Sequence, residues 1–61
     1  MARILLIDDD KSVRTAIKTA LEVQGHQVVV ANDGQEGVKT LETARFDVAI
    51  VDMFMPGDGW D

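Results

Sequence analysis

The sequence contains no cysteine, so neither a disulfide framework nor a thiolate metal site can stabilise its fold. It also has no long apolar run. The longest, such as Ile4 to Ile7, fall far short of the roughly 20 residues that a membrane-spanning helix needs. The N-terminus does not fit an export signal either, because Arg3 precedes four apolar residues and then three aspartates. We therefore expect a cytoplasmic protein.

Basic residues are scarce as well. Six lysines and arginines face eleven aspartates and glutamates, which gives a net charge of −5. Direct binding to nucleic acid needs a cationic surface, and we expect this segment to bind neither nucleic acid nor membrane. Three of the acidic residues are consecutive, Asp8 to Asp10, and this clustering is more informative than the total charge.

The chain is short, with 61 residues of which 46% are hydrophobic. This hydrophobic content is too high for a disordered tail. A chain of this size forms one domain at most, and it buries only about 60% of the surface that the unfolded chain exposes. We therefore expect a folded domain of marginal stability.

Short apolar runs alternate with amphipathic segments. The runs predict strands at about residues 3–7, 27–31 and 46–51, because they are rich in branched residues and show no alternation, as in strands buried on both faces. Apolar residues at helical spacing predict helices at about 11–24 and 34–44. For the second helix, Val38 and Leu41 are the expected buried face.

The ends of these helices are marked in the sequence. Asp10 is placed to cap the first helix, and Gly25 to end it in a left-handed conformation. Asp33 and Glu36 form an Asp variant of the capping box at the start of the second helix.

The resulting order, βαβαβ, implies an α/β fold with a parallel sheet and right-handed crossovers. The first and third runs are the most continuously apolar, so we place them side by side and predict the strand order 2-1-3. In doubly wound sheets, ligands bind beyond the carboxyl ends of the strands where the order reverses. Strand one ends at Asp8 and Asp9, and strand three ends at Asp52. We therefore expect these three aspartates to converge.

Such a cluster favours a divalent cation. Adjacent strands lie roughly 4.8 Å apart, and two carboxylates at about 4 Å repel each other by roughly 4 kcal/mol at an effective dielectric near 20. A cation removes this repulsion, and oxygen ligands favour Mg²⁺ or Mn²⁺ over zinc. A carboxylate beside the metal can also act as a nucleophile and form an aspartyl-phosphate.

Three segments together resemble the receiver domain of two-component response regulators, which has a flavodoxin-like fold. They are Ile4-Leu5-Leu6-Ile7-Asp8-Asp9-Asp10, Ala31-Asn32-Asp33-Gly34 and Val51-Asp52-Met53-Phe54-Met55-Pro56-Gly57. They occur in the family's order and at close to its spacing. The resemblance covers residues 1–61, but only the N-terminal half of a receiver domain. The Thr or Ser and the Lys with which receivers sense the phosphoryl group belong to the other half.

The resemblance implies that Asp52 is the phosphoacceptor and takes a phosphoryl group from a sensor histidine kinase or a phosphotransfer protein. It also implies a Mg²⁺ site in which Asp9 is a direct ligand, Asp8 acts through a water, and Asp52 and the Phe54 backbone carbonyl complete the set. A receiver of this kind is a signalling module and not a conventional enzyme.

Two alternatives remain open. In the first, the chain is a truncated receiver that no longer switches and acts as a structural module, associating with itself through its exposed third strand. In the second, the chain is a phosphatase of the haloacid-dehalogenase type, because Asp8-Asp9-Asp10 fits the Asp-x-Asp after a first strand. Asp8 would then be the nucleophile and Asp10 the acid/base.

Overall fold

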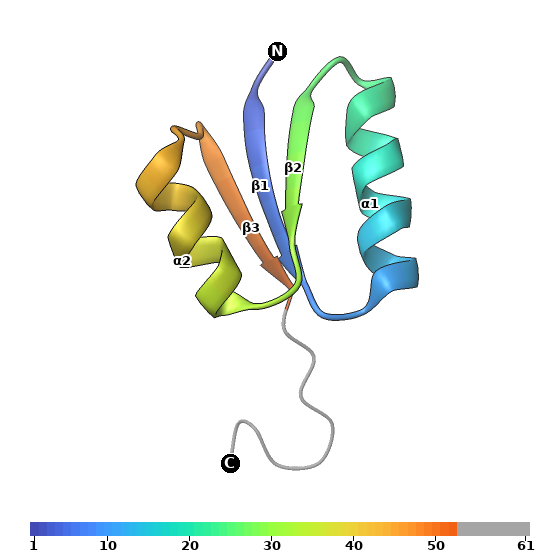
Figure 1. The fold of residues 1–61 in the computed structure, drawn as a ribbon. Helices are drawn as coiled ribbons and strands as arrows, with labels where there is room; N and C mark the ends of the chain where they lie inside the picture. The colour runs from blue at the N-terminus through green and yellow to red at the C-terminus, as the bar shows by residue number, and fades with distance from the viewer. Residues whose placement is uncertain (53–61) are drawn as a thin grey trace.

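The computed structural model describes residues 1–52, with the side chain of Asp52 outside the description. Its elements are β1 (Arg3–Asp8), α1 (Lys11–Val23), β2 (Gln27–Ala31), α2 (Gly34–Thr43) and β3 (Val48–Asp52). The strands form a parallel sheet in the order β2-β1-β3 (Figure 1). The α/β class, the βαβαβ order and the strand order 2-1-3 are therefore confirmed.

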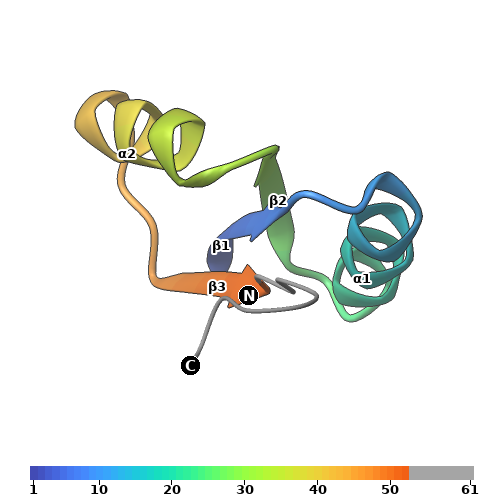
Figure 2. The ribbon, with the colours of Figure 1, turned by 90° about the horizontal axis from the view of Figure 1, so that it is seen from below.

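The strand β1 is the centre of the core. Five of its six residues are buried, and Leu5 and Leu6 are fully inaccessible to solvent. The two helices cover opposite faces of the sheet (Figure 2), so both sets of alternating β1 side chains have a neighbour. This explains why β1 is apolar without alternation: each of its faces is buried.

The predicted caps of α1 are confirmed. The Asp10 side chain accepts a hydrogen bond from the backbone N–H of Val13 at 3.1 Å, which satisfies a donor that the first helical turn leaves free. Past the end of the helix, Gly25 has a φ of +93°, the left-handed conformation that glycine adopts at little cost. Both ends of α1 were thus encoded locally.

The start of α2 is capped by Asp33, whose side chain accepts from the Glu36 N–H at 2.8 Å. The reciprocal bond differs from a standard capping box. Glu36 Oε1 accepts from the N–H of Asn32 at 2.6 Å, one residue before the cap itself. Glu36 therefore ties the helix back to the end of β2.

The third strand begins at Val48 and not near residue 46. The reason is a long-range contact at its start. Arg3 donates its N–H to Asp47 Oδ2 at 2.8 Å, and its carbonyl accepts from the Asp47 N–H at 2.8 Å. Phe46 packs against the core, with the Arg3 guanidinium 5.3 Å from the ring centroid. These two residues connect α2 to the sheet before the ladder begins.

Each helix also ends one residue earlier than expected.

The expected burial of Val38 and Leu41 was wrong for the described part of the chain. They are 56% and 48% exposed, respectively. The helix α2 approaches β1 and β2 but not β3, and its one buried residue is Gly37. A Cβ at Gly37 would overlap Ile7 Cδ1 and lie 3.0 Å from Ile7 Cγ1. Glycine at this position therefore allows α2 to pack closely on β1.

Gly37→Ala is expected to lower the free energy of unfolding by about 1 kcal/mol, because overpacking against Ile7 outweighs the better helix propensity of alanine. In an Ile7→Val background, which removes Cδ1, the same substitution should stabilise the protein. Urea unfolding followed by circular dichroism measures both effects. Gly34→Ala is the control, since a Cβ there meets nothing within 4 Å. Equal effects of Gly37→Ala in both backgrounds would contradict this packing.

Candidate functional site at the carboxyl edge of the sheet

The acidic residues predicted to converge lie at one edge of the sheet. Asp8 is the last residue of β1 and Asp52 the last residue of β3. The two are register partners in the parallel ladder, so their Cα atoms are neighbours across adjacent strands. Asn32 follows the end of β2 at the same edge, where all three strand arrows in Figure 1 point. The backbone thus brings the ends of the three strands together.

The Asp8 side chain is buried, with only 2% of the residue exposed. Its Oδ1 accepts from the N–H of Asp10 at 2.8 Å. Its other oxygen, Oδ2, is buried and has no hydrogen-bond partner among the described residues. A buried carboxylate oxygen without a donor is costly, and in native proteins it normally binds a cation, a water or a donor. Asp8 therefore carries an acceptor that no described residue satisfies.

The three consecutive aspartates have different environments. Asp8 is buried, whereas Asp9 and Asp10 are exposed. Asp10 is occupied as the cap of α1. Asp8 and Asp9 are thus the members of the run that no helix cap engages, and their roles at the site stay predictions.

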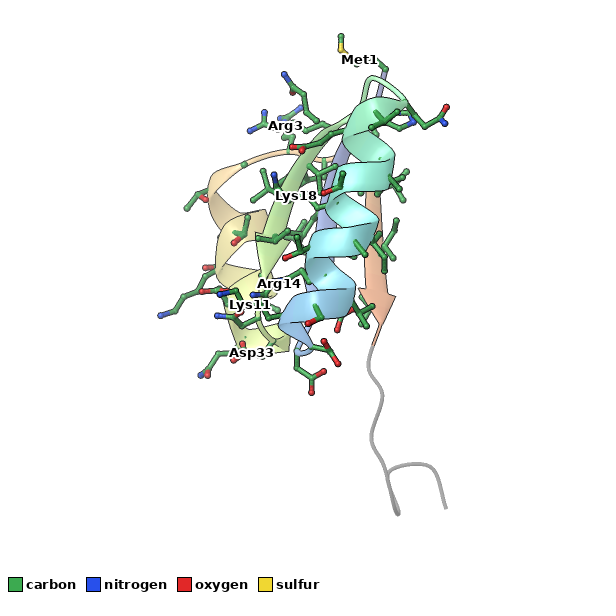
Figure 3. The ribbon with its side chains drawn as sticks, turned by 90° about the vertical axis from the view of Figure 1, so that its right-hand side faces the viewer. Met1, Arg3, Lys11, Arg14, Lys18 and Asp33 are labelled. Atoms are coloured by element: carbon green, nitrogen blue, oxygen red, sulfur yellow. The ribbon has the colours of Figure 1, made fainter. Side chains whose placement is uncertain are left out.

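Arg14 is a member of this edge that the sequence analysis did not identify. Its Nη1 donates to the backbone carbonyl of Asp8 at 2.9 Å and to Asn32 Oδ1 at 2.5 Å. Figure 3 shows Arg14 on α1 towards the end of the molecule where Asp33 also lies. The sequence places Arg14 off the apolar stripe of α1. The signal for its role is its position one turn after the cap, beside the end of β1.

The residues present fit a divalent cation in part. Among the side chains that the structure describes, no group of three or more His, Cys, Asp or Glu could hold a metal ion. The predicted ligands also include the Asp52 side chain and the Phe54 carbonyl, which lie outside the described residues. Asp8 Oδ2 and the exposed Asp9 are hard oxygen donors of the kind that Mg²⁺ and Mn²⁺ take. The Mg²⁺ site stays a prediction that this donor set supports.

His26 lies away from this edge, in the connection between α1 and β2. Its Nδ1 accepts from the N–H of Ala2 at 3.0 Å, so it attaches the residues before β1 to the turn that enters β2. The histidine has a structural role at the amino end of the sheet. In residues 1–52, neither helix is long and apolar enough to cross a membrane.

The sequence profile of the response regulator receiver domain matches residues 4–60, and the chain therefore belongs to this family. The transcriptional regulatory protein AfsQ1 of Streptomyces coelicolor is 42% identical over 62 residues; the match covers 100% of this chain and 28% of AfsQ1. The CAI-1 autoinducer sensor kinase/phosphatase CqsS of Vibrio cholerae is 46% identical over 57 residues; the match covers 93% of this chain and 8% of CqsS.

Solved structures agree with this assignment. The chemotaxis protein CheY4 of Vibrio cholerae superimposes with a TM-score of 0.84 at 41% identity; the match covers 92% of this chain and 47% of CheY4. A response regulator receiver domain protein of Clostridium thermocellum gives a TM-score of 0.78 at 40% identity; the match covers 92% of this chain and 46% of that protein. The chain therefore spans about half the length of the receiver structures that it matches.

In the absence of divalent cations, Asp8→Asn is expected to raise the free energy of unfolding by about 1–3 kcal/mol, because it removes a buried charge whose Oδ2 has no partner in the part of the chain that the structure describes. Urea unfolding in the presence of a chelator measures this change. Asp9→Asn, which removes the same charge from an exposed position, should change stability by less than about 0.5 kcal/mol. A loss of stability in Asp8→Asn, or equal effects of the two substitutions, would show that the Asp8 charge is compensated.

Proposed function

We propose that this chain is a phosphoacceptor module of a two-component phosphorelay, in which Asp52 receives a phosphoryl group from a sensor histidine kinase or a phosphotransfer protein. Membership of the receiver family supports this function. The observation that carries it is the pairing of Asp8 with Asp52 in the sheet, together with the buried Oδ2 of Asp8, which has no partner among the described side chains. A divalent cation is one of the partners that such an oxygen accepts, besides a water or a donor.

The transfer itself needs one nucleophile. A carboxylate oxygen of Asp52 attacks the phosphorus of the donor, the new O–P bond forms, and the P–N bond to the donor's histidine breaks. The leaving imidazole keeps the electron pair of the broken bond and takes up a proton. The product is an acyl phosphate, whose formation changes the charge at the carboxyl end of β3.

The acidic residues of this edge would hold Mg²⁺ or Mn²⁺, with Asp9 as a direct ligand and Asp8 acting through a water. Asp52 and the Phe54 carbonyl complete the proposed set. A bound divalent cation supplies neutralisation of the phosphoryl oxygens. In its absence, the carboxylates of this chain repel an incoming phosphoryl group. Asp8 contributes a buried charge that solvent screens little, because the residue is only 2% exposed.

The proposed setting is the cytoplasm, where response regulators meet their kinases. CqsS is by its name a sensor kinase/phosphatase, so sequences similar to this chain occur in kinases as well as in regulators.

A phosphatase of the haloacid-dehalogenase type is disfavoured, because Asp10, its acid/base, is the helix cap of α1. The proposed module is a signalling unit and not a conventional enzyme.

Incubation with Mg²⁺ and a small phosphodonor is expected to add a single phosphoryl group to the chain, as measured by intact mass. Asp52→Asn should abolish the adduct, because it removes the nucleophile, and a chelator should abolish it in the wild-type chain. Glu42→Gln is the matched control, since it removes an exposed carboxylate on α2. An adduct that persists in Asp52→Asn would contradict the proposed acceptor.

A second proposal concerns assembly: the chain associates with a second copy through β3. This strand pairs with β1 on one side, and within the described sheet it is an edge. Its residues Val48 and Val51 are 47% and 54% exposed, and they project to opposite faces of the sheet by strand alternation. An open edge with apolar flanks favours pairing with another chain. This assembly is the alternative function if the chain accepts no phosphoryl group.

Sedimentation velocity is expected to show a concentration-dependent shift from monomer to dimer for the wild-type chain. Val51→Lys should weaken this association by about tenfold or more, because it places a charge on the apolar flank of the edge strand. Val23→Lys, at an equally apolar but distant position that is 78% exposed, is the control. A wild-type chain that stays monomeric at high concentration would rule out the proposed assembly.

A further inference from the structure

A continuous set of hydrogen bonds links the acidic edge to the start of α2. Arg14 Nη1 donates both to the Asp8 carbonyl and to Asn32 Oδ1. The Asn32 N–H donates to Glu36 Oε1 at 2.6 Å, and the Glu36 N–H donates to the Asp33 cap at 2.8 Å. The set therefore connects the ends of β1 and β2 to the first turns of both helices.

The contacts of Arg14 are unusual for an arginine beside three aspartates. Its described bonds go to a backbone carbonyl and to an amide oxygen, and both of these acceptors are neutral. The guanidinium is therefore held over the strand ends without forming an ion pair with the carboxylates described there. Arg14 is also only partly exposed, and its two bonds form a brace between the ends of β1 and β2.

The brace acts on Asp8. The Asp8 backbone carbonyl is fixed by Arg14, and its Oδ1 is fixed by the Asp10 N–H at 2.8 Å. With these two groups held, Oδ2 is the remaining oxygen, and it is buried and without a partner among residues 1–52. Arg14 itself contacts Asp8 only at the backbone carbonyl.

We propose that Arg14 is a positioning residue for divalent-cation binding at this edge. Through its bond to Arg14, Asn32 then also affects the cation affinity, although Asn32 has no carboxylate of its own. This inference rests on the proposed Mg²⁺ site. Residues that orient metal ligands typically change metal affinity by about 10- to 100-fold when removed. Here we expect a change in Mg²⁺ affinity near the lower end of this range, because Asp8 is one of several residues in the proposed site.

The sign of the effect separates positioning from simple electrostatics. Arg14 carries a positive charge close to the acidic cluster, so as a charge alone it repels a divalent cation. Removing it would then strengthen Mg²⁺ binding. As a positioning residue, its removal leaves Asp8 less ordered and weakens Mg²⁺ binding. The two roles predict opposite changes in the same measurement.

The test is titration of the 61-residue chain with Mg²⁺ alone, followed by calorimetry, for the wild type and the variants Arg14→Met, Asn32→Ala and Arg45→Met. Arg14→Met should weaken Mg²⁺ binding by about tenfold. Asn32→Ala, which leaves the net charge unchanged, should weaken it by about threefold, since it removes one of the two partners of Arg14. Arg45→Met removes the same charge from an exposed position between α2 and β3, and it should leave the affinity unchanged or slightly raised.

A second measurement tests the same role without metal. In the metal-free protein, Arg14→Met should speed hydrogen exchange of the Asp10 amide by about five- to tenfold, because that N–H is bonded to the Asp8 side chain. Arg14→Met should leave exchange in the middle of β2 unchanged. Faster exchange throughout the sheet would mean that Arg14 only supports the fold, and the inference would be wrong.

The outcomes are distinguishable from failure of the proposed function. A wild-type chain that binds no Mg²⁺ would overturn the metal site, and the role of Arg14 in it would fall as well. If the wild type binds Mg²⁺ while Arg14→Met and Asn32→Ala bind it as tightly or more tightly, only the positioning role is wrong. Circular dichroism of each variant establishes that the comparison is between folded chains.

Discussion

The burial of β1 on both faces is the constraint on which the rest of this structure depends. Leu5 and Leu6 are fully inaccessible because β2 and β3 flank the strand and the two helices cover its faces. The apolar run ends at a residue that is buried yet charged, Asp8. The same packing that stabilises the sheet therefore removes a carboxylate from water, and this places a cost on folding that only a cation, a water or a donor can offset.

Local polar contacts then connect the ends of the elements at the carboxyl edge. The caps of α1 and α2 begin each helix within two residues of a strand end. Arg14 and Glu36 extend these caps into contacts with the neighbouring strands. As a result, the turns that carry Asp8, Asn32 and Asp33 form one connected unit, as expected of a site whose groups must be held in a fixed arrangement.

The sequence was sufficient for the element order, the strand order and the helix caps, because each follows from local pattern: apolar runs, a 3.6-residue period, and Asp or Gly at the ends. It was insufficient where distant residues decide. The start of β3 depends on Asp47 meeting Arg3, the exposure of Val38 on what lies beside α2, and the role of Arg14 on a bond to Asn32. The acidic residues were identified from their positions at strand ends, whereas the burial of Asp8 and the exposure of Asp9 required the structure.

The paired contact between Arg3 and Asp47 has a consequence for which changes this chain can tolerate. Asp8 lies five positions after Arg3, and Asp52 lies five positions after Asp47. The contact at one end of the ladder therefore determines which residues meet at the other end. Substitutions within β1 or β3 leave this count intact, whereas inserting or deleting a single residue in either strand moves one aspartate out of step and turns its side chain to the other face. Across related sequences, the spacing between these positions should thus be under stricter selection than the residues that fill it.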